Sequence, residues 1–96
     1  MIITFNLHCY TYWGQNLFLH INGETVAMHY VADSQWQCSY NLTAKTEMVY
    51  DYFVQNPEQT HIVESPKSRI LPATTTDLQV FDTFRYQSMA HIFRTT

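Results

Sequence analysis

The sequence predicts an all-β domain, an antiparallel β-sandwich of seven or eight short strands. Apolar and polar residues alternate with a period of two along most of the chain, which is typical of strands with one buried face. Turn residues such as Asn22-Gly23 and Asn56-Pro57 interrupt the alternation at intervals of roughly 8–10 residues. No helical period extends over a useful length. The spacing indicates a sandwich or barrel of immunoglobulin-like size.

Four strands are expected in the first half of the chain. The opening segment alternates without a break, with Ile3, Phe5 and Leu7 on one face. A turn at Trp13-Gly14 separates it from the next alternating run, and Asn22-Gly23 predicts a hairpin after that run. The expected strands are residues 3–10, 17–21, 25–31 and 36–42.

Four more strands are expected in the second half. Met48, Tyr50, Tyr52 and Val54 share one face of the first of them, and a Pro-containing turn follows it. The expected strands are residues 48–55, 60–64, 68–71 and 78–85. The alternation then stops, so we expect a domain over residues 1–86 and a linker toward a following domain over 87–96.

Composition and charge exclude several classes of partner. The net charge is −3, and the five Lys and Arg residues are scattered. Without a basic stripe, neither nucleic acid nor an anionic membrane surface is an expected partner. The N-terminus has no basic n-region or apolar h-region, so no signal peptide is expected and the predicted location is cytoplasmic. Cys9 and Cys38 are accordingly expected to be reduced core thiols.

The residues give no pattern for catalysis or for a bound ion. The eight acidic residues are spread along the chain without a paired arrangement. With only two glycines, phosphate-binding and nucleophile-elbow motifs are excluded. His8, His20 and His29 could share one sheet face as metal ligands, but they lack ligand spacing and are better explained as polar surface residues. No enzyme activity, metal or cofactor is therefore expected for this chain alone.

Aromatic residues are the most informative feature that remains. The aromatics in the expected strands should pack in the core: Trp36, Tyr40, Tyr50, Tyr52 and Phe53. Tyr10, Tyr12 and Trp13 instead gather at a turn, where full burial is harder. An exposed ring on a rigid sheet can stack on the apolar face of a sugar or pack against another protein surface. The residues alone leave both roles open for Trp13.

Several strings in order resemble the starch-binding domains, the family 20 carbohydrate-binding modules. Thr4-Phe5-Asn6 is followed by Trp13-Gly14-Gln15-Asn16-Leu17-Phe18-Leu19, where the family has Y-G-x-N-L-Y-L. Glu64 to Arg69 matches W-E-x-x-x-N-R, and Asp82-Thr83-Phe84-Arg85 matches D-x-W-R. The resemblance covers residues 3–85. It implies an antiparallel β-sandwich that binds α-1,4-glucan or maltooligosaccharides through two aromatic-lined sites.

Carried onto this chain, the resemblance implies one sugar site. Trp13 takes the place of its stacking aromatic, with Tyr12 or Tyr30 as a second platform, and Gln15 and Asn16 would hydrogen-bond sugar hydroxyls. The family's other site departs from the pattern: Val63 replaces its Trp, Asp51 replaces its Lys, and no Trp follows Leu19. Trp36 and Phe84 match positions expected to be structural.

The setting implied by the resemblance is the N-terminal module of bacterial 4-α-glucanotransferases, the amylomaltases of glycoside hydrolase family 77. The module would be non-catalytic, with the catalytic domain of the parent chain as a partner. One alternative is a degenerate sandwich that no longer binds sugar and contacts a neighbouring domain or a second subunit. Another is an unrelated immunoglobulin-like adhesion module with a Cys9–Cys38 disulfide.

Overall fold

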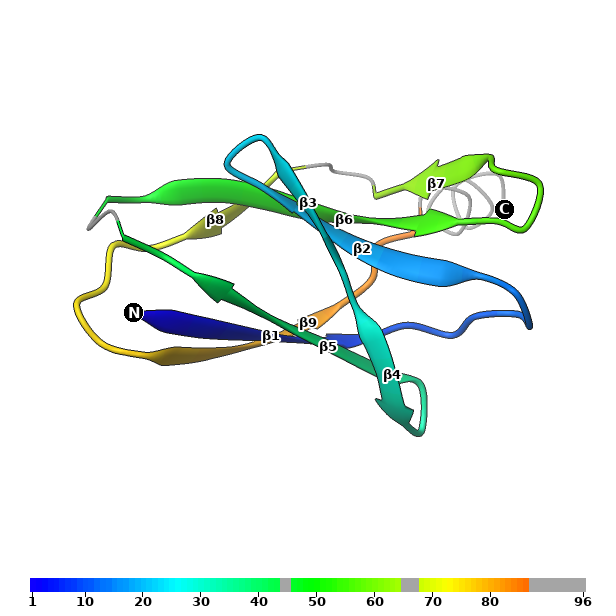
Figure 1. Ribbon diagram of the computed structural model, residues 1–96, viewed down its shortest axis with the longest axis horizontal. Helices are drawn as coiled ribbons and strands as arrows, with labels where there is room; N and C mark the ends of the chain where they lie inside the picture. The colour runs from blue at the N-terminus through cyan, green and yellow to red at the C-terminus, as the bar shows by residue number, and fades with distance from the viewer. Residues whose placement is uncertain (44–45, 65–67, 87–96) are drawn as a thin grey trace, which may run out of the picture.

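Two β-sheets packed face to face form the protein, as the computed structural model in Figure 1 shows for residues 1–43, 46–64 and 68–86. One sheet has the order β4-β5-β1-β9, and the other has β3-β2-β6-β7 with β8 paired to β6. The strands are β1 (Ile2–His8), β2 (Asn16–Ile21), β3 (Glu24–Ala27), β4 (His29–Ala32), β5 (Gln35–Asn41), β6 (Met48–Gln55), β7 (His61–Val63), β8 (Arg69–Leu71) and β9 (Leu78–Thr83). The predicted all-β sandwich is confirmed, and the expected linker at 87–96 lies outside the described residues.

One predicted strand is divided between the two sheets, which raises the number of strands described to nine. The run expected at 25–31 becomes β3 in the five-stranded sheet and β4 in the four-stranded sheet. Met28 lies between them, buried, and its N–H donates to the Leu17 carbonyl at 2.9 Å. Because Val26 and Met28 both still point inward, the alternation is the same on either side of the switch. The pattern therefore could not reveal the break.

The four-stranded sheet contains a parallel pair, which the antiparallel prediction missed. Strand β1 lies between β5, to which it is antiparallel, and β9, to which it is parallel. Phe5 is thus opposite Cys38 on one side and Val80 on the other. Parallel pairing requires a long connection, and the rest of the domain lies between β1 and β9.

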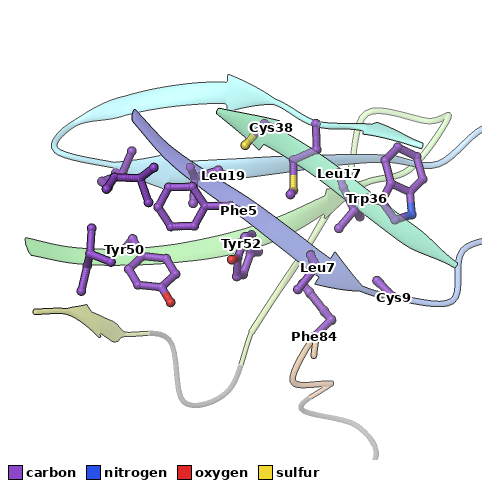
Figure 2. Packing of buried hydrophobic residues seen from close by; sticks show 14 of the residues in the cluster. Phe5, Leu7, Cys9, Leu17, Leu19, Trp36, Cys38, Tyr50, Tyr52 and Phe84 are labelled. Carbon is purple, nitrogen blue, oxygen red and sulfur yellow. The ribbon is translucent and has the colours of Figure 1, made fainter. Parts of the chain in front are cut away.

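The core fills the space between the sheets with the inward half of each alternating strand (Figure 2). Trp36, Tyr52 and Phe84 are buried there, as expected. Cys9 and Cys38 are buried free thiols, and burial raises the pKa of Cys38 to about 11. Phe53 was wrongly assigned to the core: it points outward and stacks on Phe18 with ring centroids 5.1 Å apart.

A buried ionic network joins β6, β8 and β9 at one margin of this core. The Glu64 carboxylate accepts from Arg69 Nε at 3.0 Å, and Arg69 NH1 lies 3.1 Å from Asp82 Oδ1. The hydroxyls of Tyr50 and Tyr52 both donate to Asp82 Oδ2, at 2.8 and 2.7 Å. Burial, with Asp82 beside them, raises the pKa of both tyrosines, so their hydroxyls remain donors. These carboxylates are thus used structurally.

Candidate functional site

The Trp13 side chain projects from the tip of a tight turn between β1 and β2. Tyr12 and Gln15 close the turn, because the Gln15 N–H donates to the Tyr12 carbonyl at 3.1 Å. Gly14, the third residue, has φ +90°, the left-handed backbone that a type II turn requires at this position. The indole is 98% exposed and the neighbouring Tyr12 ring 83% exposed. The sequence prediction of an exposed Trp at a tight turn is therefore confirmed.

A second turn, between β6 and β7, braces this tip. The Gln15 side chain accepts the Tyr12 N–H at 2.6 Å and donates through Nε2 to Asn56 Oδ1 at 2.7 Å. Gly14 lies against Pro57 so closely that a Cβ on Gly14 would be 2.8 Å from the proline Cγ. Gln15, expected as a sugar contact, therefore has its amide engaged within the protein and fixes the turn.

Tyr30 lies at the same end of the four-stranded sheet. Its hydroxyl accepts the Ser34 N–H at 3.2 Å, and the Ser34 carbonyl accepts the Cys9 N–H at 2.9 Å. These bonds connect Tyr30 to the base of the Trp13 loop. Figure 1 shows the β1–β2 turn at the right-hand end of the molecule and the β4–β5 turn lower in the same half. The Tyr30 ring packs edge-on against Trp36, with centroids 5.4 Å apart, and is 54% exposed.

Tyr86 fixes the beginning of the same loop. Its hydroxyl donates to the Tyr10 carbonyl at 2.7 Å and lies 3.3 Å from Cys9 Sγ. Burial raises the pKa of both the Cys9 thiol and the Tyr86 hydroxyl, so neither group ionises near neutral pH. Asn16, the remaining expected sugar contact, is exposed at the start of β2 opposite Gln55. The structure thus places Tyr12 and Trp13 on one loop, Asn16 at the start of the strand that follows it, and Tyr30 at the base of the loop.

A second feature is a hollow of about 240 Å³ on the outer face of the five-stranded sheet. The Phe53 ring stacks on Phe18 and lies 4.7 Å from the His61 ring. His20 Nδ1 is 3.5 Å from Asp51 Oδ1. The residues lining the hollow are His20, Asp51, Tyr52, Phe53, His61 and Val63. Asp51 and Val63, which the sequence resemblance aligns with the second sugar site of starch-binding domains, therefore lie together here.

Sequence reasoning missed the aromatic part of this hollow. Phe18 and His20 alternate with the buried Leu17 and Leu19, so their outward direction could have been predicted. Their meeting with Phe53 and His61 depends on the pairing of β2 with β6, two strands that are distant in sequence, and of β6 with β7.

Within the described residues, no three His, Cys, Asp or Glu side chains are grouped to hold a metal ion. His8 and His29 are on strands of the four-stranded sheet, whereas His20 is on β2 of the other sheet. The suggestion that these three histidines share a sheet face is wrong, because a Cys9–Gln15 loop carries the chain from one sheet to the other. The described part of the chain also contains no helix with the length and apolarity to cross a membrane.

Comparison with known proteins identifies the fold but no family. No family model and no curated protein match the sequence. Part of the glycoside hydrolase family 15 glucoamylase from Hypocrea jecorina matches 88% of this chain, with a TM-score of 0.76 and 24% identity. The γ-CGTase from alkalophilic Bacillus clarkii (TM-score 0.77, 17% identity) and the Hormoconis resinae glucoamylase (TM-score 0.72, 25% identity) also match 88% of it. The chain spans only 15–17% of these structures, so it shares its fold with one portion of each of these starch-active enzymes.

Proposed function

We propose that this chain is a non-catalytic binding module for α-1,4-glucans, with Trp13 as its sugar-stacking platform. The observation on which the proposal rests is the 98% exposed indole on a turn that Gln15 and Pro57 hold rigid. The exposed rings of Tyr10 and Tyr12 lie on the same loop, and a group of exposed apolar rings marks an interaction site. The fold shared with portions of two glucoamylases and a CGTase supports a glucan as the partner at this site.

The binding mechanism uses a few side chains at one end of the sandwich. A glucose ring would place its apolar face on Trp13, and Tyr12 or the half-exposed Tyr30 would form the second platform. Asn16 is the exposed amide available to sugar hydroxyls, while Gln15 positions the turn. A single open platform binds weakly, and we expect a Kd between about 0.1 and 1 mM, or roughly −4 to −6 kcal/mol.

The parent protein we propose is a 4-α-glucanotransferase, with this module preceding its catalytic domain in the cytoplasm. Weak binding is sufficient in that setting, because a tethered module raises the effective concentration of glucan near the active site by orders of magnitude. The catalytic carboxylates would then belong to the rest of the parent chain.

A second candidate function is contact with a neighbouring domain or a second subunit, without sugar binding. The hollow on the five-stranded sheet favours it. Val63 and Asp51 occupy the places of the family's second Trp and its Lys, and a Phe18–Phe53–His61 row lies beside them. An apolar row of this kind suits a protein surface as well as a sugar.

Titration with maltoheptaose and with β-cyclodextrin separates the two functions. Trp36 is buried, so sugar-dependent changes in tryptophan fluorescence report chiefly on Trp13. We expect saturable fluorescence and amide-shift changes at Trp13 and Asn16 that disappear in Trp13→Ala. The matched control is Ile70→Ala, which removes a 61% exposed apolar side chain from β8 of the five-stranded sheet and should leave binding unchanged. A flat response of the folded wild type at millimolar sugar would refute the Trp13 sugar site and favour the contact function.

A further inference from the structure

The outer face of the four-stranded sheet is uncharged in every cross-strand row of its described residues. Residues directly opposite each other share a face, and the strand registers therefore define four rows on this face. These are His29–Gln37–Asn6–Phe81, Ser39–Thr4–Gln79, Ala32–Gln35–His8–Thr83 and Asn41–Ile2. Charged residues usually make up about 25–35% of a protein surface. Thirteen paired positions without Lys, Arg, Asp or Glu thus indicate a face suited to a neutral partner.

Side-chain amides on this face are held in one orientation. Gln37 Nε2 donates to Asn6 Oδ1 at 2.8 Å, and Asn6 Nδ2 donates to Gln79 Oε1 at 3.0 Å. Asn6 Nδ2 also donates to the Val80 carbonyl at 3.1 Å. The relay crosses three strands and leaves the Gln37 carbonyl oxygen at one end and the Gln79 amide N–H groups at the other. Prealigned donors and acceptors lose little conformational freedom when a partner binds.

Exposed rings accompany the amides. Phe81, at one end of the first row, is 76% exposed. Tyr10, also 76% exposed, packs edge-on against His8 with centroids 5.7 Å apart. Tyr10 belongs to the same loop as Trp13, so the loop that carries the proposed sugar platform begins beside this face. Apolar rings set among hydrogen-bonding groups match a polyhydroxylated partner, which has both apolar faces and hydroxyls.

We propose that this face is a second glucan-binding surface, one that takes neutral chains packed side by side. Four strands at about 4.8 Å spacing make it roughly 14 Å wide, too wide for one sugar ring and suited to a flat, ordered partner. A second copy of this chain is the competing occupant. Protein interfaces favour aromatic, Met and Arg side chains at their centres, whereas amides and hydroxyls predominate here. The inference rests on the proposed glucan-binding function and extends it to insoluble glucan.

Adsorption to insoluble granular starch, measured beside maltoheptaose titration, tests this surface. Phe81→Ala removes the exposed ring, and Gln79→Glu adds a charge while keeping an acceptor for the Asn6 amide. We expect each variant to adsorb to granules about five- to tenfold more weakly, with maltoheptaose affinity unchanged within about twofold. Ile70→Ala, on the opposite sheet, is the control and should adsorb like the wild type. Unchanged urea midpoints show that the variants are folded.

The outcomes separate this inference from the proposed function. Wild-type adsorption in both variants overturns the second surface and leaves the Trp13 site intact. Adsorption that needs Phe81 in a protein that does not bind maltoheptaose supports the surface and refutes the Trp13 site. A wild type that binds neither sugar form refutes both. Concentration-dependent sedimentation that Phe81→Ala abolishes, with granule adsorption unchanged, assigns the face to a second copy and overturns the glucan assignment.

Discussion

Substitution of Gly14 by Ala tests whether the Trp13 turn is held as the structure indicates. Two independent penalties act on the new methyl group. A left-handed backbone costs a residue with a Cβ about 1–2 kcal/mol, and Gly14 has φ +90°. The Cβ would also lie 2.8 Å from Pro57 Cγ, and such overpacking costs about 1–3 kcal/mol. We therefore expect Gly14→Ala to lower the free energy of unfolding by about 2–5 kcal/mol, a large part of a typical 5–15 kcal/mol.

The chain offers a control that separates the two penalties. Gly23 has a similar φ of +73°, but a Cβ there would meet nothing within 4 Å. Gly23→Ala should therefore show only the backbone penalty, about 1–2 kcal/mol. Pro57→Ala combined with Gly14→Ala should recover most of the difference, because it removes the crowded Cγ. Urea unfolding followed by circular dichroism gives all three values.

The same variant connects the turn to sugar binding. Displacement of the turn should weaken maltoheptaose binding in Gly14→Ala, whereas Gly23→Ala should bind like the wild type. Equal unfolding free energies for Gly14→Ala and Gly23→Ala would refute the contact with Pro57, and with it the bracing of Trp13.

Three further predictions follow from the described contacts. Arg69→Met leaves the buried Glu64 carboxylate without its cationic partner and should lower the free energy of unfolding in urea by about 3–5 kcal/mol. Adding Glu64→Gln should restore much of that free energy, and failure to do so would contradict the network. The pKa of Cys38 is raised from 9.0 to about 11, so the folded state holds this proton more tightly than the unfolded state. Stability should be full below pH 9 and fall by roughly 2–3 kcal/mol as pH rises to about 11, and Cys38→Ala should flatten that decline. Gln15→Ala loses the hydrogen bonds to Tyr12 and Asn56 and should lower the free energy of unfolding by about 0.5–1.5 kcal/mol. It should also lower the backbone NMR order parameters at the turn tip, and unchanged order parameters would show that the Gln15 amide does not brace the turn.

The parts of this fold that depend on neighbouring residues could be predicted from the sequence. Ile3, Phe5 and Leu7, which alternate in the sequence, are all fully buried. The exposed tip at Trp13 could be predicted because a glycine follows it and permits a tight turn. Both conclusions need only neighbouring residues.

Features that depend on distant pairing could not be predicted in this way. The Gln15–Asn56 bond joins residues 41 positions apart, so the role of Gln15 as a brace follows only from the fold. The assignment of Phe53 to the core was wrong for a related reason, because β6 carries aromatic residues on both of its faces. Strand pairing places Tyr52 opposite Leu19 and Phe53 opposite Phe18. Alternation identifies two faces of a strand without showing which face an aromatic pair will cover.

Rigidity at the turn determines how a weak sugar site can function. Ordering a side chain on binding costs about 0.5–1.5 kcal/mol, and the backbone beneath Trp13 is already fixed by Pro57 and Asn56. Most of the stacking energy therefore appears as affinity, although one ring supplies little of it. A second contact surface connected through Tyr10 would act on the same polymer at a high effective concentration. Short sugars can reach only the Trp13 platform, whereas an ordered glucan can contact the platform and the neutral sheet face together. The ratio of granule affinity to maltoheptaose affinity then reports the contribution of the sheet face to glucan binding. Phe81→Ala should lower that ratio, whereas Trp13→Ala should lower both affinities.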